Sequence, residues 1–275
     1  AGAAGTASAT PGGSATDVTS AAADVASTVD IEPDDVLDSE MIDRVMRELL
    51  DQPDEVLRVH DEPLSAELLQ LATLLLKYMP GELSRYRKEV IKFGWNHLKR
   101  EDSVAKQWAF VNVSRFIEAY QAPDKIILQV YVALLRACQA DGRALVRQAL
   151  DILTPALPRR LVHNPIDHKY PIWIRYTKKI LLEEGHSLPH LVHIWQLIVR
   201  HSSSFYAARA QFVPIMVNLL SRMSASSSAS LPEYRRLAVD LADLVISWDI
   251  QRMNAARKRA RVLNQRGGLY PWRTI

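Results

Sequence analysis

Apolar residues recur at spacings of three and four along most of this chain, which is the period of a helix with one buried face. The pattern is clearest between residues 86 and 157, where it predicts three or four helices in close succession. One helix follows Pro123, and its buried face would carry Ile127, Val130, Tyr131, Leu134, Leu135 and Cys138. The helix before it would bury an aromatic stripe of Trp108, Val111, Ile117 and Tyr120. Only Gln121 and Ala122 separate the two stripes, so these helices must fold back on each other.

The same period continues on both sides of this central stretch. Helices are expected at about residues 41–50, 65–79, 173–184, 188–198, 205–223 and from 230 to beyond 248. Ser187 should cap one of these helices and Pro214 should kink another. Ser230 and Glu233 have the spacing of a capping box at the start of the last one. The proline-rich segment 157–171 has no period and predicts a loop.

Together these features predict an all-α protein, because no stretch alternates with period two for long enough to predict a strand pair. Helix pairs begin near residues 35, 82, 123 and 171, at intervals of about 40–48 residues, as is typical of HEAT and armadillo repeats. We therefore expect an α-solenoid of HEAT/armadillo-like helix pairs, with a compact helical bundle as the alternative. No apolar run reaches the ~18–20 residues that cross a bilayer, so no membrane partner is expected.

The formal net charge of +3 conceals a strong asymmetry along the chain. Residues 1–62 hold 15 acidic and three basic side chains, whereas residues 63–250 hold 24 basic and 16 acidic ones. The last 25 residues hold seven Arg and Lys and no acid. Because residues 1–33 are dominated by small side chains that bury little surface, we expect a flexible low-complexity segment there. A helical-repeat solenoid should follow over residues 34–250, and a basic tail over residues 251–275.

The tail contains the only compact basic cluster that suggests a site. Arg257, Lys258, Arg259 and Arg261 lie within five consecutive positions and would suit a nuclear-import signal or contacts with phosphates. A solvated helix end is the plain alternative. No aromatic residue is interleaved with these cations to stack on bases until Tyr270 and Trp272.

Residues that could support catalysis or metal binding do not form a convincing set. His186, His190 and His193 could share a helix face, but no cysteine or carboxylate follows at ligand spacing, so we expect hydrogen-bonded or solvated histidines. Glu183 and Glu184 should point about 100° apart at a solvated helix end rather than converge as an acid–base pair. The glycines lack the spacing of a phosphate-binding loop. We expect no catalytic residues, cofactor, metal or small-molecule substrate.

The single cysteine, Cys138, cannot form a disulfide within the chain, which fits a reducing compartment. Its place on a predicted apolar face favours a buried structural thiol over a reactive one.

Five segments carry a family resemblance: IKFGWNHLKREDSVAKQWAFV, RFIEAYQAPDKIILQVYVALLRA, GRALVRQALDILTPALPRR, IRYTKKILLEEGHSLPHLVHIWQLIVRH and YAARAQFVPIMVNLLSR. In this order, over about residues 35–250, they resemble the transformation/transcription domain-associated protein family. These proteins are giant pseudokinase scaffolds of SAGA-type histone acetyltransferase complexes. The resemblance implies a piece of their central helical solenoid, well before the kinase-like domain.

Two functional hypotheses follow. The resemblance implies a non-catalytic scaffold segment of a nuclear transcription coactivator, with transcription activators and subunits of histone acetyltransferase complexes as partners. The alternative is a nucleic-acid-binding helical-repeat protein that uses its basic middle and tail. An enzyme is not expected.

Overall fold

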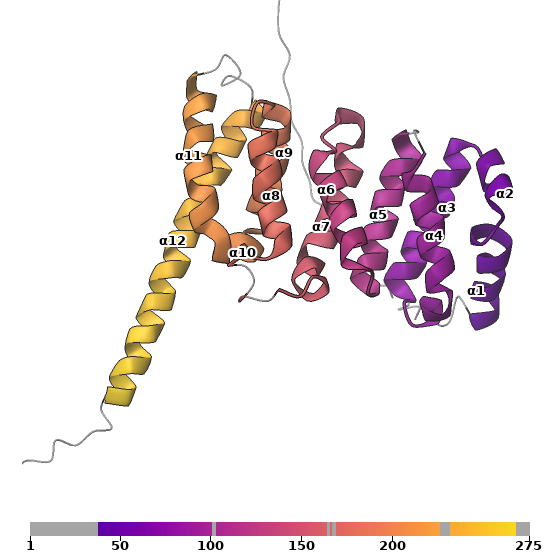
Figure 1. The fold of residues 1–275 in the computed structure, drawn as a ribbon, viewed down its shortest axis with the longest axis horizontal. Coiled ribbons are helices and arrows are strands. Elements are labelled where there is room, and N and C mark those ends of the chain that lie inside the picture. The colour runs from indigo at the N-terminus through magenta and orange to yellow at the C-terminus, as the bar shows by residue number, and fades with distance from the viewer. Residues whose placement is uncertain (1–37, 101–102, 164–165, 167–168, 226–231, 268–275) are drawn as a thin grey trace, which may run out of the picture. The chain divides into compact units, whose positions relative to one another are not determined.

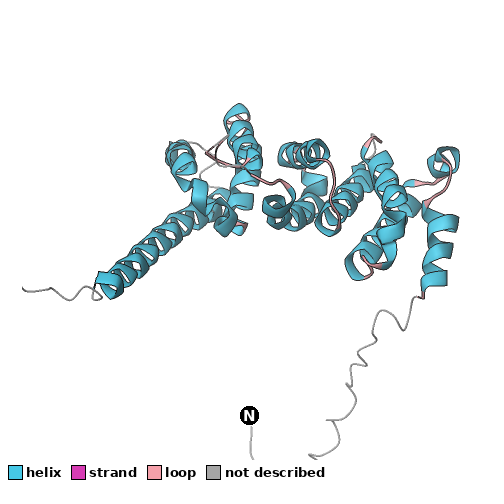
Figure 2. Ribbon diagram, turned by 60° about the horizontal axis from the view of Figure 1, so that its bottom comes forward, coloured by secondary structure: helices cyan, strands magenta, loops and turns pink. Residues whose placement is uncertain are grey.

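The computed structural model describes residues 38–267, except for residues 101–102, 164–165, 167–168 and 226–231. Every regular element in this part of the chain is helical and none is a strand, so the predicted all-α fold is confirmed (Figures 1 and 2). The expected flexible segment 1–33 and the Ser230 capping residue lie outside the described residues. No helix in the described part is both long and apolar enough to cross a membrane.

Twelve α-helices and several short helical turns follow one another along the described residues. Helix α1 continues into a π-helical turn, Met46–Leu50, and α4 is preceded by a 3₁₀ turn, Glu82–Tyr86. The helices are α1 Ser39–Val45, α2 Asp54–Val59, α3 Glu62–Tyr78, α4 Arg87–Leu98, α5 Ser103–Ala119, α6 Asp124–Arg136, α7 Arg143–Arg160, α8 Ile172–Glu183, α9 Leu188–Arg200, α10 Ser202–Phe205, α11 Arg209–Ala225 and α12 Pro232–Gly267.

The longer helices stack as pairs in two rows. In one row α3, α5, α7, α9 and α12 each pack against the next, while α4, α6 and α8 pair with members of that row from the other side (Figure 1). Short connections between successive helices keep each pair antiparallel. Pairs begin at Arg87, Asp124 and Ile172, close to the starts that the sequence period indicated. The repeated pairing is the α-solenoid that the sequence predicted.

Local sequence signals explain several helix starts. The Oδ1 atom of Asp38 accepts a hydrogen bond from the backbone N–H of Met41 at 2.7 Å, and Asp61 caps α3 in the same way through Leu64 at 3.0 Å. Both bonds satisfy N–H groups that the first turn of a helix leaves unpaired. Pro123 immediately precedes α6, where its fixed φ guides the chain into the helix.

Close packing of α3, α4 and α5 depends on three small or polar residues. Asn112 of α5 donates from Nδ2 to the Thr73 hydroxyl of α3 at 3.2 Å, and Thr73 donates to the Leu69 carbonyl at 2.7 Å. A Cβ atom at Gly94 of α4 would lie 2.5 Å from the Asn112 Oδ1 atom and 3.0 Å from Val113. Glycine is therefore required for α4 to lie this close to α5.

A chain of edge-to-face aromatic contacts joins five helices in the second half of the solenoid. Ring centroids are separated by 6.5 Å for Tyr131 and Trp173, 5.3 Å for Trp173 and Phe205, 5.6 Å for Phe205 and Phe212, and 6.3 Å for Phe212 and Trp195. All five side chains are buried. Such pairs stabilise beyond the area they bury, so this cluster joins α6 to α8, α9, α10 and α11.

Three details differ from the sequence-based expectations. Trp108 is only half-buried, whereas Val111 and Ile117 of its predicted stripe are fully buried. Cys138 lies beyond the end of α6 at Arg136 and is half-buried, not part of a buried helix face. Helix α7 continues through Pro155 and Pro158 to Arg160, four residues into the segment expected to be a loop.

The extension of α7 has a local cause. The guanidinium groups of Arg159 and Arg160 donate hydrogen bonds to the backbone carbonyl of Glu118, at 3.2 and 2.6 Å. Glu118 lies in the last turn of α5, where carbonyl groups lack partners within the helix. These tertiary contacts hold the last turn of α7 against α5 and stabilise it despite its prolines.

Truncating Trp195 should test the packing of the solenoid core. Trp195 is fully buried between α9 and α11, so Trp195→Ala should lower the free energy of unfolding by about 3–5 kcal/mol. The matched variant Trp108→Ala removes the same type of side chain from a half-buried position. It should lower the free energy of unfolding by less than half as much. Urea denaturation followed by circular dichroism measures both. Equal losses in the two variants would contradict this packing.

Candidate functional site

The basic cluster that the sequence singled out lies on the last part of α12. Arg257, Lys258, Arg259 and Arg261 are all exposed, as is every residue from Asp249 to Val262. This part of α12 extends away from the stacked helices (Figures 1 and 2). The four cations therefore follow one solvent-exposed helix.

The three histidines do not converge on one point. His193 is turned toward α6, where its Nε2 atom donates to the Leu134 carbonyl at 3.0 Å, while His186 is exposed. Burial lowers the pKa of His193 below its ordinary value, which favours the neutral ring. In the described residues, no three His, Cys, Asp or Glu side chains are arranged to hold a metal ion. Two of the histidines are hydrogen-bonded, as the sequence analysis expected.

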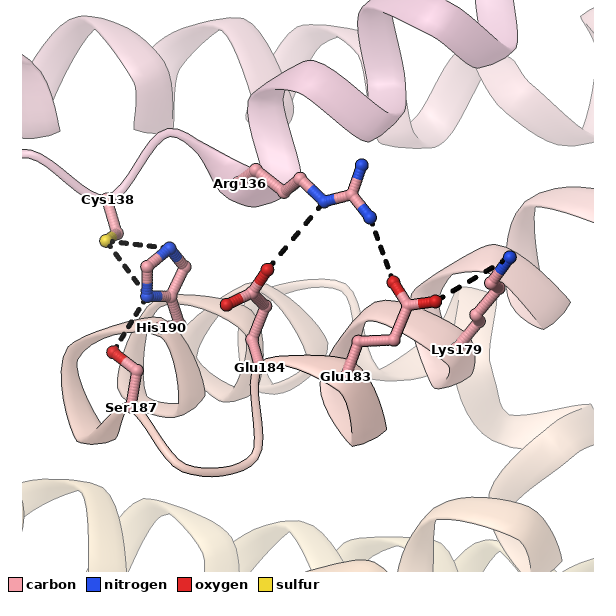
Figure 3. A network of polar contacts seen from close by, with 7 residues as sticks. All are labelled: Arg136, Cys138, Lys179, Glu183, Glu184, Ser187 and His190. Carbon is pink, nitrogen blue, oxygen red and sulfur yellow. Dashed lines mark hydrogen bonds and ion pairs between the residues drawn. The ribbon is translucent and has the colours of Figure 1, made fainter.

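His190 contacts the only cysteine (Figure 3). The Cys138 Sγ atom lies 3.2 Å from Nε2 and 3.4 Å from Nδ1 of His190, and the Ser187 Oγ atom lies 2.8 Å from Nδ1. Ser187 occupies the expected N-cap position of α9, but its hydroxyl bonds this ring instead of the helix backbone. Burial raises the pKa of the Cys138 thiol. A protonated thiol is a poor nucleophile, so the raised pKa of Cys138 disfavours covalent catalysis at this contact.

Glu183 and Glu184 both contact the guanidinium group of Arg136. Arg136 of α6 lies 2.9 Å from Glu183 and 3.8 Å from Glu184, and Lys179 lies 3.6 Å from Glu183 (Figure 3). Glu184 is the C-cap of α8, and its backbone is no longer helical. Its side chain is therefore not held about 100° from that of Glu183. Exposed ion pairs of this kind contribute about 0–1 kcal/mol. The pairs link α6 to α8 and indicate a structural contact.

A groove between α4 and the connection from α5 to α6 is the site that the sequence analysis missed. It has a volume of about 590 Å³. We call it the basic groove, since its cationic lining consists of Arg87, Lys88, Lys92 and Lys99. Its apolar lining consists of Ile91, Trp95, Phe116, Ala122, Pro123 and Ile126.

One face of α4 supplies most of this groove. Ile91 and Lys92 lie three and four residues after Lys88, Trp95 lies seven after it and Lys99 eleven, which places all five in one stripe. The opposite face of α4, with Val90, Phe93 and His97, is buried against the rest of the solenoid. The mixed stripe was a readable signal in the sequence. A helix that is apolar on one face and both apolar and cationic on the other predicts a second, external contact.

Comparisons with known proteins agree with the fold. Over residues 16–267 the chain matches the sequence model of a family described as the Tra1 HEAT repeat ring region. It is 50% identical over 200 residues to the probable transcription-associated protein 1 of Dictyostelium discoideum, covering 73% of this chain and 4% of that protein. It is 37% identical over 198 residues to the transformation/transcription domain-associated protein of Homo sapiens, covering 68% of this chain and 5% of that protein.

A yeast relative has a name that places it in two complexes. The SAGA complex/NuA4 acetyltransferase complex subunit TRA1 of Saccharomyces cerevisiae is 32% identical over 192 residues, covering 69% of this chain and 5% of that protein. The chain thus spans about 4–5% of the length of these relatives. The resemblance found in the sequence is confirmed.

Two buried histidines should make the stability of the fold depend on pH. Burial lowers the pKa values of His97 and His193 from the ordinary value of 6.5. Between those lowered values and 6.5, the unfolded chain binds more protons than the native chain. The free energy of unfolding should therefore fall as the pH falls below about 6.5, and this contribution should be constant above it.

Urea denaturation at several pH values between about 5.5 and 7.5 measures this dependence. His97→Gln and His193→Gln should each make the decline shallower, because each removes one imidazole that titrates differently in the two states. The prediction fails if the decline is the same in the wild-type chain and in both variants.

Proposed function

Because the chain belongs to the family of the Tra1 HEAT repeat ring region, we propose that it is a non-catalytic scaffold segment of a nuclear transcription coactivator. In this role it holds subunits of histone acetyltransferase complexes and binds transcription activators that recruit them. The observation that carries the proposal is the stack of antiparallel helix pairs between α3 and α12. Stacked pairs present long surfaces to protein partners and need no active site.

The relatives support the scaffold proposal at a coarser level. The names of the matched proteins describe transcription-associated proteins and an acetyltransferase complex subunit, and the matched family is a HEAT repeat region. The nucleus is the compartment that fits such proteins. The groups most suggestive of chemistry, the Cys138–His190 contact and the Glu183–Glu184 pair, are bonded in ways that suit structure rather than catalysis.

The exposed end of α12 favours a second candidate function, which is contact with nucleic acid. Residues 251–275 hold seven cations and no acid, and the four clustered ones are exposed along one helix. Helix α12 runs without interruption across the boundary at residue 250 to Gly267, so its basic part is presented on a defined helix. Lys and Arg on such a surface bind phosphates without regard to base sequence.

Affinity capture from nuclease-treated nuclear extract tests the scaffold proposal. The full 275-residue chain should retain subunits of a histone acetyltransferase complex, and the retained fraction should show acetyltransferase activity on histones. An unrelated HEAT-repeat protein of similar size and charge is the control. Retention no greater than that of the control would count against the scaffold function.

Salt dependence of DNA binding tests the second candidate. If the cluster contacts phosphates, replacing Arg257, Lys258, Arg259 and Arg261 with glutamine should weaken DNA binding at low salt. The slope of log K against log salt should also become smaller by about 0.9 for each phosphate contact that is lost. Fluorescence anisotropy with a labelled duplex measures both quantities. Identical slopes for the wild-type and variant chains would remove the cluster from this function.

A further inference from the structure

We propose that the basic groove binds an acidic peptide segment of a protein partner, and that this segment inserts a bulky apolar side chain beside Trp95. The inference deepens the scaffold function proposed above and rests on it, because it assigns one site and one partner chemistry to the surface of the solenoid.

The floor of the groove explains the apolar side chain. Phe116 and Ala122 are buried, while Ile91, Trp95 and Ile126 are half-buried and keep part of their surface in the groove. A half-buried tryptophan next to aliphatic side chains in a concave site is the usual setting of an energetically dominant contact. Filling the groove with a leucine or phenylalanine would remove this apolar surface from water.

The rim of the groove explains the acidic character. Arg87, Lys88 and Lys99 are exposed at its edge, and among the described residues that line it there is no Asp or Glu. Arg87 is also held near the Tyr120 ring, at 5.9 Å from its centroid, which limits its conformational freedom. Cations at both ends of an apolar floor attract a segment with the opposite charge and orient it.

The length of the stripe sets the length of the partner segment. From Lys88 to Lys99 the stripe covers eleven helical steps, which correspond to ~16 Å at the rise of an α-helix. A helical segment of about eleven residues, or a shorter extended one, would therefore reach all the rim cations. Such a segment needs acidic residues at both ends and an apolar one near its middle, opposite Trp95.

Two other anionic ligands fit the groove less well. A small polyphosphate would pair with the cations but would leave the apolar floor in contact with water, so it would gain no free energy from burying that surface. A single-stranded nucleic acid could stack one base on Trp95, but successive bases need successive aromatic platforms. Of the two aromatic residues among the described lining residues, Phe116 is buried, so only Trp95 could serve as such a platform.

Fluorescence anisotropy with a labelled acidic peptide of about twelve residues tests the proposal. The peptide carries Asp and Glu at both ends and phenylalanine in the middle, and the protein is the full chain. Trp95→Ala should weaken binding roughly 30-fold. Lys88→Glu combined with Lys99→Glu should weaken peptide binding roughly 10-fold or more, and the loss of affinity should be larger at low salt than at high salt.

The control variant Lys77→Glu combined with Arg175→Glu changes the net charge by the same amount at exposed positions that do not line the groove. It should leave peptide affinity within about twofold of wild type. Replacing the central phenylalanine of the peptide with serine should weaken binding about as much as Trp95→Ala does. Thermal unfolding of each variant confirms that it is folded, and the lysine double variant tests the site even if Trp95→Ala fails to fold.

Several results would overturn the proposal. These are no measurable binding of the acidic peptide, equal affinity for the serine peptide, or an equal loss in the two charge-reversal variants. Stronger binding of single-stranded DNA than of the peptide, lost in Trp95→Ala, would assign the groove to nucleic acid instead. If the chain captures acetyltransferase subunits but binds no peptide, the assignment of the groove is wrong and the scaffold function stands. If the chain binds the peptide but captures no subunits, the scaffold function is wrong and the groove still binds acidic peptides.

Discussion

The fold depends on helices that are buried on more than one side. Helix α5 shows this most clearly, because it packs against α3, α4 and α7 and has no exposed residue from Ala105 to Tyr120. A helix that is buried all round cannot be stable in water by itself. Its neighbours must be present to cover it, so the helix pairs of the solenoid stabilise one another in sequence.

This constraint divides the surface into structural and available parts. Gly94 and Asn112 bring α4 close to α5, and the aromatic chain from Tyr131 to Trp195 fixes the later helices. Groups that could suggest catalysis serve the same packing, since Arg136 joins α6 to the end of α8 and His190 covers Cys138. The outer stripe of α4 and the exposed length of α12 are two surfaces that this packing leaves open to partners.

The sequence predicted the fold well because the determinants of a solenoid are local. Apolar spacing, Pro123 and Ser187 indicated helices and their starts, and the short connections indicated pairing. The errors arose where tertiary contacts decide. Trp108 shares the period of Val111 and Ile117 but lies at the edge of the interface, and Arg159 and Arg160 extend α7 by bonding α5. The basic groove escaped prediction because Phe116 and Ile126 come to it from other helices, although the stripe on α4 was visible.

Carbodiimide cross-linking of an assembled coactivator complex, followed by mass spectrometry, tests the central claim most directly, since this reagent couples lysine amines to carboxylates in contact. The claim is that this segment of the solenoid is a protein-binding surface. We expect Lys88 or Lys99 to be coupled to Asp or Glu residues of another subunit or of a bound activator. Coupling of these lysines only to carboxylates of the same polypeptide would mean that the segment is internal architecture, and would contradict the account.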